Sequence, residues 1–445
     1  MSHSHPSEAI LIRAGRVIDP ASGLDRVTDV ALRDGLVAEI GDGLSPSPAD
    51  RVIDAEGLLV TPGLIDPHVH LREPGQTHKE DIASGTRAAV AGGFTTVCCM
   101  PNTAPAIDSP GVVRQILKRA DETASCRVFP VSCATKARLG ETMAPIGLCA
   151  KAGSVGISDD GDVVASPRMM RDVLEATRAA GLAFMQHAQE TTLTQGAAMH
   201  EGAVAARLGL TGWTRVAEEI IVERDVQLSE ETGCDYHVQH VSSGGTVEIL
   251  RQARARGLPV SGEASPHHLH LTHEACEQGG GFNTAAKMNP PLREQSDVDA
   301  LRQGVADGTI TILATDHAPH TRAEKTRPFA EAPFGIIGLE CALALYAEAL
   351  VHTGAIDWPK LIELMTLNPA RLCRLDRLGL GSLSVGGPAD VTLIDPDLAW
   401  TLTESELAGK SSNTPFLGRA LTGRAVGVIV GGRVRAERRS DVTQH

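Results

Sequence analysis

The feature that most constrains the fold is a series of eight short β-rich runs in the middle of the chain. Most of them are separated by segments with apolar residues at helical spacing and a glycine near the end, such as EDIASGTRAAVAG and PRMMRDVLEATRAAG. Eight alternating units of this kind predict an α/β fold with a (β/α)8 TIM-like barrel. The runs cover residues 65–71, 95–100, 128–133, 155–158, 183–187, 236–241, 258–262 and 310–314.

Both ends of the chain carry strand-like segments of a different kind. Residues 10–60 alternate between apolar and polar positions and are broken by turn signals, and ADVTLIDPD at 389–397 is another short strand. The sequence IRAGRV at 12–17 also resembles IVGGRV at 429–434. These patterns predict a small β-sandwich-like domain from residues 1–60 and 376–445, and a barrel from residues 61–375. The gap between the fifth and sixth runs is long and contains an extra helical stretch at 213–233, so this gap is expected to carry a lid or a subunit contact.

Composition excludes several classes of protein. The net charge is −14 and no cluster of Lys and Arg forms a basic face, which argues against nucleic-acid binding. No apolar stretch approaches the ~20 residues of a membrane span, and the N-terminus lacks the apolar region of a signal peptide. A cytoplasmic protein without membrane contact is expected. The nine cysteines include no CxxC pair, which favours reduced, buried packing residues.

Polar residues gather at the ends of the eight runs, and in a barrel those ends form one rim. A lone histidine in such a place is more often a hydrogen-bonded packing residue than a ligand, but this rim combines several imidazoles with carboxylates. That set of ligands suits Zn²⁺ or a similar divalent ion. The residues are His68, His70, Arg72, Asn102, Asp159, Asp160, His187, His240 and Asp316.

Side-chain alternation along a strand limits which of these residues can share a face. Asp159 and Asp160 are neighbours, and His237 and His240 are three apart, so one residue of each pair is expected to be structural. The histidines of SPHHLHLT, at positions 267, 268 and 270, lie beyond their strand and are interpreted as packing or supporting residues.

Several motifs resemble those of dihydroorotases of the amidohydrolase superfamily, in the branch that associates with aspartate transcarbamoylase. They are DPHVHLREPG, GGFTTVCCMPNTAP, SDDG, KMNPPLR and ATDHAPH, together with the strands that carry His187 and His240. Many relatives have a bridging carboxylated lysine on the fourth strand, but this chain has SDDG there, and Lys151 lies before that strand at the wrong end. The resemblance implies one or two Zn²⁺ ions, with Asp160 as the bridge, held by His68, His70, Asp160, His187, His240 and Asp316.

The resemblance also implies an activity and a substrate site. The activity is the reversible cyclisation of N-carbamoyl-L-aspartate to (S)-dihydroorotate with release of water, the third step of de novo pyrimidine (UMP) biosynthesis. A metal-bound hydroxide would be the nucleophile and Asp316 the proton shuttle. Arg72, expected on the same strand face as His70, would bind the substrate carboxylate. The implied substrate residues are His70, Arg72, Asn102, Asn289, His320, Phe334 and Gly335.

Alternatives remain at this point. Asn102 and Asn289 precede Thr and Pro, where a simple turn residue is equally expected. A hydantoinase or allantoinase would share the barrel and the metals, and an inactive scaffold subunit of aspartate transcarbamoylase would share the fold. The resemblance indicates a homo-oligomer and leaves association with aspartate transcarbamoylase open.

Overall fold

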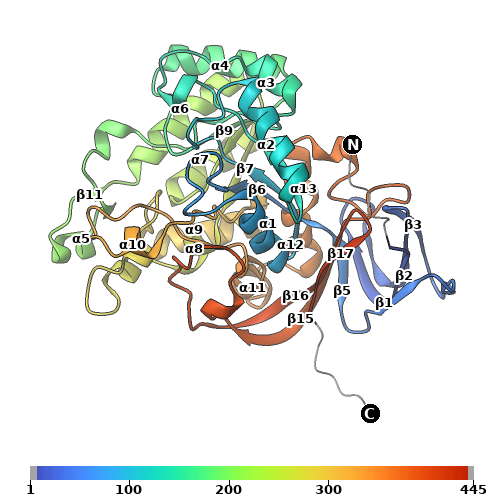
Figure 1. The fold of residues 1–445 in the computed structure, drawn as a ribbon. Coiled ribbons are helices and arrows are strands. Elements are labelled where there is room, and N and C mark those ends of the chain that lie inside the picture. Colours follow the sequence, from blue (N-terminus) through green and yellow to red (C-terminus); the bar gives the residue numbers. More distant parts are fainter. Residues whose placement is uncertain (1–7, 439–445) are drawn as a thin grey trace.

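The computed structural model describes residues 8–438, which form an α/β fold (Figure 1). Residues 1–7 and 439–445, which belong to the small domain expected from the sequence, lie outside the described residues. Within the described part no helix is both long and apolar enough to cross a membrane. All nine cysteines are buried and free of disulfide bonds, as their apolar surroundings predicted.

Strands from both ends of the chain form one sheet, in the order β17-β16-β15-β5-β1-β2-β3, with β4 paired to β1. In Figure 1 the blue N-terminal strands and the red C-terminal strands lie side by side. The junction is the antiparallel pair of β5 and β15, so the chain between them leaves this sheet and returns to it. The strands are β1 (Ile10–Asp19), β2 (Leu24–Arg33), β3 (Leu36–Gly41), β4 (Arg51–Asp54), β5 (Leu59–Pro62), β15 (Val391–Thr401), β16 (Ala420–Val430) and β17 (Arg433–Glu437).

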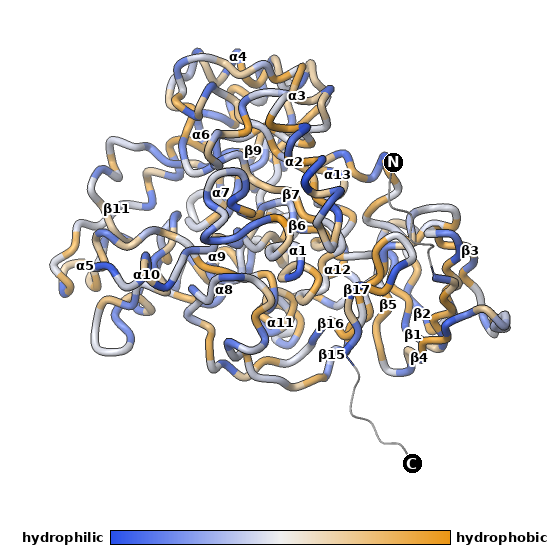
Figure 2. Tube along the Cα trace, viewed as in Figure 1, coloured by the Kyte–Doolittle hydropathy of each residue, from blue (hydrophilic) through white to orange (hydrophobic). Residues whose placement is uncertain are grey.

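The sheet has an apolar core of its own, because alternate strand residues point to the same face. Ile10, Ile12, Val60, Val391 and Ile429 are buried together in this core. Figure 2 shows hydrophobic segments both in the middle of the molecule and along the terminal strands.

The middle of the chain contains two groups of parallel strands. One group has the order β6-β7-β8 and the other the order β14-β13-β12-β9. Single parallel bridges connect them: Ile157 pairs with Ser132 and with Phe184, and Val69 pairs with His317. Each of the eight β-rich runs overlaps one of these pairing segments. The strands are β6 (Leu64–Val69), β7 (Phe94–Cys99), β8 (Arg127–Pro130), β9 (Phe184–Gln186), β12 (Tyr236–Val238), β13 (Val260–Ala264) and β14 (Ile312–Leu313).

Helices follow these strands, and local signals set their ends. Asp81 caps the first of them by accepting a hydrogen bond from the backbone N–H of Ser84, and Ser109 and Ser166 cap the next long helices in the same way before a proline. The principal helices are α1 (Ile82–Ala91), α2 (Pro110–Thr123), α3 (Ile146–Ala152), α4 (Pro167–Ala179), α6 (Val216–Thr232), α7 (Gly244–Ala255), α9 (Gln295–Ala306), α11 (Ala342–Tyr346), α12 (Trp358–Met365) and α13 (Leu367–Leu372).

The stretch 213–233 contains the expected helix, but this helix is not an extra one. This stretch forms α6, which packs between α4 and α7 as one of the regular covering helices. Its buried face includes two carboxylates: Glu218 accepts hydrogen bonds from Ser242, and Asp225 accepts them from Gln186 and Tyr236. These charged residues interrupt the apolar stripe that would mark a covering helix in the sequence. The inserted segment lies before α6 and contains β10 (Met199–His200), α5 (Ala203–Leu208) and β11 (Gly212–Trp213).

Candidate metal and substrate site

The six expected metal ligands lie together at the C-terminal ends of the parallel segments, and all six are buried. Asp66 connects β6 to the segment after β14. Its carboxylate accepts hydrogen bonds from the backbone N–H groups of His68 (3.0 Å) and Thr315 (3.2 Å). Two ligands, His240 and Asp316, have positive φ angles of 32° and 48°. Non-glycine residues adopt this backbone conformation at a cost, and it is often found at functional sites.

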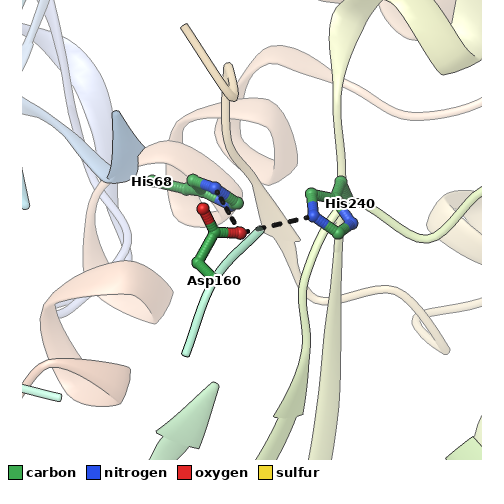
Figure 3. Close-up of side chains that lie close together, drawn as sticks. All are labelled: His68, Asp160 and His240. Atoms are coloured by element: carbon green, nitrogen blue, oxygen red, sulfur yellow. Dashed lines mark ion pairs between the residues drawn. The ribbon is translucent and has the colours of Figure 1, made fainter. Parts of the chain in front are cut away.

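Asp160 lies at the centre of the group. Its Oδ1 atom is 3.5 Å from Nε2 of His68, 3.6 Å from Nε2 of His240 and 3.7 Å from Nδ1 of His187. Its Oδ2 atom is 3.6 Å from Nε2 of His70. Figure 3 shows the Asp160 carboxylate between the rings of His68 and His240. One carboxylate therefore faces all four imidazoles.

Asp316 approaches the same group from the segment after β14. Its Oδ1 atom is 3.0 Å from Nε2 of His70 and 3.4 Å from Nε2 of His68. Burial raises the pKa of Asp316, but the charge of His68 and the hydrogen bond from His70 outweigh it and hold this pKa below its ordinary value. The Asp316 carboxylate is therefore ionised at neutral pH.

The arrangement fits a divalent cation. Ligand atoms of His68, Asp160 and His240, and those of His68, His70 and Asp316, lie within 4.8 Å of one another. Ligands at about 2.0–2.1 Å around a tetrahedral Zn²⁺ are ~3.4 Å apart, close to the separations found here. Nε2 of His68 is buried without a hydrogen-bond partner, and Nδ1 of His187 faces Nε2 of His240 at 2.9 Å. A cation would give these nitrogens a common partner.

The electrostatics also favour a positive charge at this place. Burial lowers the pKa of His68, but the carboxylates of Asp316, Glu263 and Asp160 outweigh it and raise this pKa well above its ordinary value. A bound cation would satisfy the same carboxylates while the imidazole stays neutral.

Glu263, on β13, contacts two of the expected ligands and was not among the residues expected from the sequence. Its Oε1 atom is 2.5 Å from Nδ1 of His68 and accepts a hydrogen bond of 3.1 Å from the backbone N–H of His240. Its Oε2 atom is 3.0 Å from Nε2 of His237. A carboxylate on Nδ1 leaves Nε2 of His68 free to face the metal. The only available signal was the inward position of a glutamate in the buried run VSGEA.

Most of the residues expected to be structural make hydrogen bonds away from the ligand group. His267 is buried with its ring centre 4.4 Å from that of His268, and its Nε2 has no hydrogen-bond partner among the described residues. Asp159 accepts hydrogen bonds from the backbone N–H groups of Ala134 and Thr135 rather than facing the histidines. His237 bonds to Ser261 and Glu263. His268 and His270 bond to backbone carbonyls, of Pro290 at 3.0 Å and of Leu345 at 2.7 Å. Lys151 is exposed on α3.

Both asparagines expected at the substrate site are close to the ligand group. Oδ1 of Asn102 is 2.9 Å from Nδ1 of His70, and its Nδ2 donates to Oδ2 of Asp160 at 3.2 Å. Nδ2 of Asn289 donates to Oε1 of Gln189 at 3.1 Å, and the same oxygen is 3.1 Å from Nε2 of His187. Gln189 therefore connects Asn289 to the ligand group, a role that nothing in the sequence marks.

Arg72 reaches this region by a route that differs from the expectation. The strand β6 ends at Val69, and Arg72 has a φ of 57°, so strand alternation does not place it on the face of His70. Its buried guanidinium donates to the carbonyl of Pro319 at 3.2 Å and has Nη2 3.3 Å from Nε2 of His320. The left-handed turn after the strand thus brings Arg72 to His320.

Phe334 and Gly335 lie beside His320. Gly335 has a φ of 148°, and a Cβ atom there would come within 2.6 Å of the carbonyl oxygen of Ala318 and 2.8 Å of the His320 ring, so only glycine fits. The Phe334 ring packs against Trp213, with ring centres 5.9 Å apart, and against Lys287. Gly335 therefore lies against His320, which in turn lies beside Arg72.

Comparisons with known proteins agree on the family and the fold. The family model described as dihydro-orotase-like matches residues 57–246. A dihydroorotase of Trichlorobacter lovleyi is 48% identical over 96% of this chain and 98% of its own length, and one of Anaeromyxobacter dehalogenans is 47% identical over 96% and 98%. Among solved structures, an L-hydantoinase (dihydropyrimidinase) from Arthrobacter aurescens has a TM-score of 0.87, with 26% identity and 98% of both chains covered. A D-hydantoinase from Thermus sp. has a TM-score of 0.82, with 25% identity and coverage of 96% and 95%.

Proposed function

Because the chain belongs to the dihydroorotase family, we propose that it interconverts N-carbamoyl-L-aspartate and (S)-dihydroorotate and so acts as a cyclic amide hydrolase. The observation that carries this proposal is the joint position of two groups: Asp160 among four imidazoles, and Arg72 with His320 next to them. The first group suits metal-assisted hydrolysis of an amide. The second suits a substrate that carries its own carboxylate.

We propose that the parallel segments close into a (β/α)8 barrel spanning residues 61–375, with the terminal sheet as a second domain. Support comes from the bridges at Ile157 and at Val69, because they connect the two groups of parallel strands on both sides. The chain path supports the domain boundaries, since β5 ends just before β6 begins.

The six ligands His68, His70, Asp160, His187, His240 and Asp316 would hold one or two ions, and we propose Zn²⁺. Such an ion, when bound, supplies a Lewis acid for the amide carbonyl and lowers the pKa of water from 15.7 to about 7. Asp160 is the proposed bridge in place of a carboxylated lysine, and its central position supports this role.

Residues of the chain transfer the proton and orient the substrate. In hydrolysis the Asp316 carboxylate takes a proton from water and returns it to the leaving ring nitrogen, and in cyclisation it moves the proton in the opposite direction. Arg72, Asn102 and His320 orient the substrate carboxylate, and Asn289 with the backbone of Phe334 and Gly335 holds the amide edge of the ring. The cytoplasmic location, self-association and a complex with aspartate transcarbamoylase stay predictions from the sequence.

Assays with dihydroorotate, hydantoin and allantoin side by side test the function. We expect hydrolysis of dihydroorotate alone, because Arg72 and His320 need a carboxylate and only dihydroorotate carries one. Preferred turnover of hydantoin or allantoin would contradict the proposal and favour the alternative that the distant structural neighbours represent. No turnover of any of the three by metal-loaded protein would favour the inactive scaffold.

The proton balance provides a second test. Cyclisation converts a dianion into a monoanion and water and therefore consumes one proton. We expect the equilibrium ratio of dihydroorotate to N-carbamoyl-L-aspartate to fall about tenfold per pH unit between pH 6 and pH 9, because this ratio is proportional to the proton concentration. Chromatography of mixtures equilibrated from both directions measures it. A ratio that does not change with pH would show that another reaction is catalysed.

Replacing Arg72 by lysine is expected to raise the KM for dihydroorotate at least about tenfold with unchanged metal content, because a point charge replaces the planar fork that pairs with a carboxylate. Steady-state kinetics and elemental analysis measure the two quantities. Arg119→Lys is a matched control, since Arg119 pairs with Glu73 on the outside of α2. Loss of zinc with an unchanged KM would mean that Arg72 supports the metal group instead.

A further inference from the structure

His320 lies between two cationic side chains. Nζ of Lys79 is 3.4 Å from its Nδ1 atom, and Nη2 of Arg72 is 3.3 Å from its Nε2 atom. The histidine and the arginine are buried, and the side chain of Lys79 is only 14% exposed. The histidine backbone is fixed as well, because its N–H donates to Oδ1 of Asn413 at 2.9 Å.

The ring in this position is neutral. Burial lowers the pKa of His320, and the charges of Arg72, Lys79 and Lys325 lower it further. Together they outweigh a hydrogen bond to the backbone of Phe334, which raises this pKa, and hold it well below its ordinary value. A neutral imidazole has one N–H group and one lone pair, whereas ammonium and guanidinium groups can only donate. Only one of the two cations can therefore donate a hydrogen bond to the ring. At the other nitrogen two donors face each other, and an acceptor placed there would satisfy both.

The surroundings favour a proton on Nε2 over a proton on Nδ1. A proton on Nδ1 would have to find an acceptor beside Lys79, and the nearest carboxylate oxygen, Oε2 of Glu324, is 3.8 Å from Nδ1, beyond hydrogen-bond reach. That oxygen already accepts hydrogen bonds of 2.9 Å from the backbone N–H and from the hydroxyl of Thr321. Thr321 is the residue that caps the N-terminus of α10 (Arg322–Lys325). A proton on Nε2 instead points to the side of Arg72, where the proposed substrate carboxylate would accept it.

We propose that Lys79 is a positioning residue that sets the tautomer of His320: it donates to Nδ1 and so keeps the proton on Nε2, where this N–H and the Arg72 guanidinium together receive the substrate carboxylate. This inference rests on the proposed function. Lys79 is held for the task from two sides. Its Nζ atom is 3.1 Å from Oε1 of Glu324, and its carbonyl accepts a hydrogen bond of 2.8 Å from Ser411.

The test replaces Lys79 by methionine in the metal-loaded enzyme. We expect the KM for dihydroorotate to rise at least about tenfold, more than kcat falls, because an unfixed tautomer weakens binding of the carboxylate. Lys79→Arg restores a donor and should recover most of the lost affinity. Lys118→Met is the matched control: Lys118 lies on α2 with its side chain 78% exposed, near Glu122 at 4.0 Å, so the KM of this variant should stay within about threefold of the wild-type value.

A double-mutant cycle with His320→Asn separates the inference from a merely structural role. If Lys79 acts through His320, Lys79→Met should add little to the KM of His320→Asn. Nitrogen-15 spectra of histidine-labelled enzyme, assigned with the His320 variant, should show an unprotonated Nδ1 that is lost in Lys79→Met. If the wild-type enzyme turns over dihydroorotate, then an unchanged KM in Lys79→Met, or fully additive effects in the cycle, overturns the role of Lys79. No turnover by the wild-type enzyme overturns the proposed function itself.

Discussion

Replacing Asp316 by asparagine is expected to lower kcat at least about 100-fold, the usual contribution of a positioned acid or base, while the fold and the metal are retained. An amide oxygen can still coordinate a cation weakly, but an amide cannot accept and return a proton. The Asp316 carboxylate lies 3.0 Å from Nε2 of His70, and its lowered pKa leaves it ionised and ready to accept a proton. Initial rates in both directions, with metal content measured on the same samples, provide the readout.

Asp162→Asn is the matched control for this change. Asp162 lies two residues after Asp160, but its side chain is 52% exposed and pairs with Arg138. This variant should have nearly normal turnover. Nearly normal turnover in Asp316→Asn as well would remove Asp316 from the proton transfer, and loss of the metal in that variant would show that its main role is coordination.

Replacing Glu263 by alanine is expected to lower both stability and metal affinity. The carboxylate is fully buried against His68, His237 and the backbone N–H of His240, and removing one partner of a buried ion pair typically costs ~3–5 kcal/mol of unfolding free energy. The orientation of His68 depends on this contact, so metal affinity should fall about 10–100-fold. Urea unfolding of the metal-free protein and titration with a chelator measure the two effects separately.

Asp390→Asn provides the comparison. Asp390 is also buried and also paired, with Arg127 at 2.7 Å, but it belongs to the terminal sheet region. The Asp390→Asn variant should be less stable than the wild-type protein but should bind the metal with the same affinity. Glu263→Gln keeps the shape and should retain the fold if alanine does not. Wild-type metal affinity in both Glu263 variants would show that His68 needs no support from this residue.

The arrangement of strands could be predicted because its signals are local. Each of the eight β-rich runs is a short apolar stretch bounded by turn residues, and each overlaps a pairing segment. The ends of the chain could be paired because their strand patterns resemble each other. The nature of α6 could not be predicted in this way, since Glu218 and Asp225 are buried there against partners on other elements.

The candidate site shows the same division. The expected ligands follow strand ends, and parallel strands bring their carboxyl ends to the same edge of a sheet. Glu263 and Lys79 have no comparable signal, because each contacts a histidine that is distant in the sequence. Gln189 has none either, because its contact with Asn289 joins residues that are 100 positions apart. The predicted strand face of Arg72 was wrong. A strand pattern in the sequence cannot reveal that β6 ends at Val69 and that Arg72 has a positive φ.

The terminal sheet has a consequence for synthesis of the chain on the ribosome. Strand β5 pairs with β1 on one side and with β15 on the other. The first strands can form as soon as they emerge, but one edge of β5 stays unpaired until Val391 and the residues after it have been made. At ~5–20 residues per second this interval lasts roughly tens of seconds. An unpaired strand edge can pair with a strand of another chain. During this interval the nascent protein avoids such aggregation only if the free edge of β5 is covered.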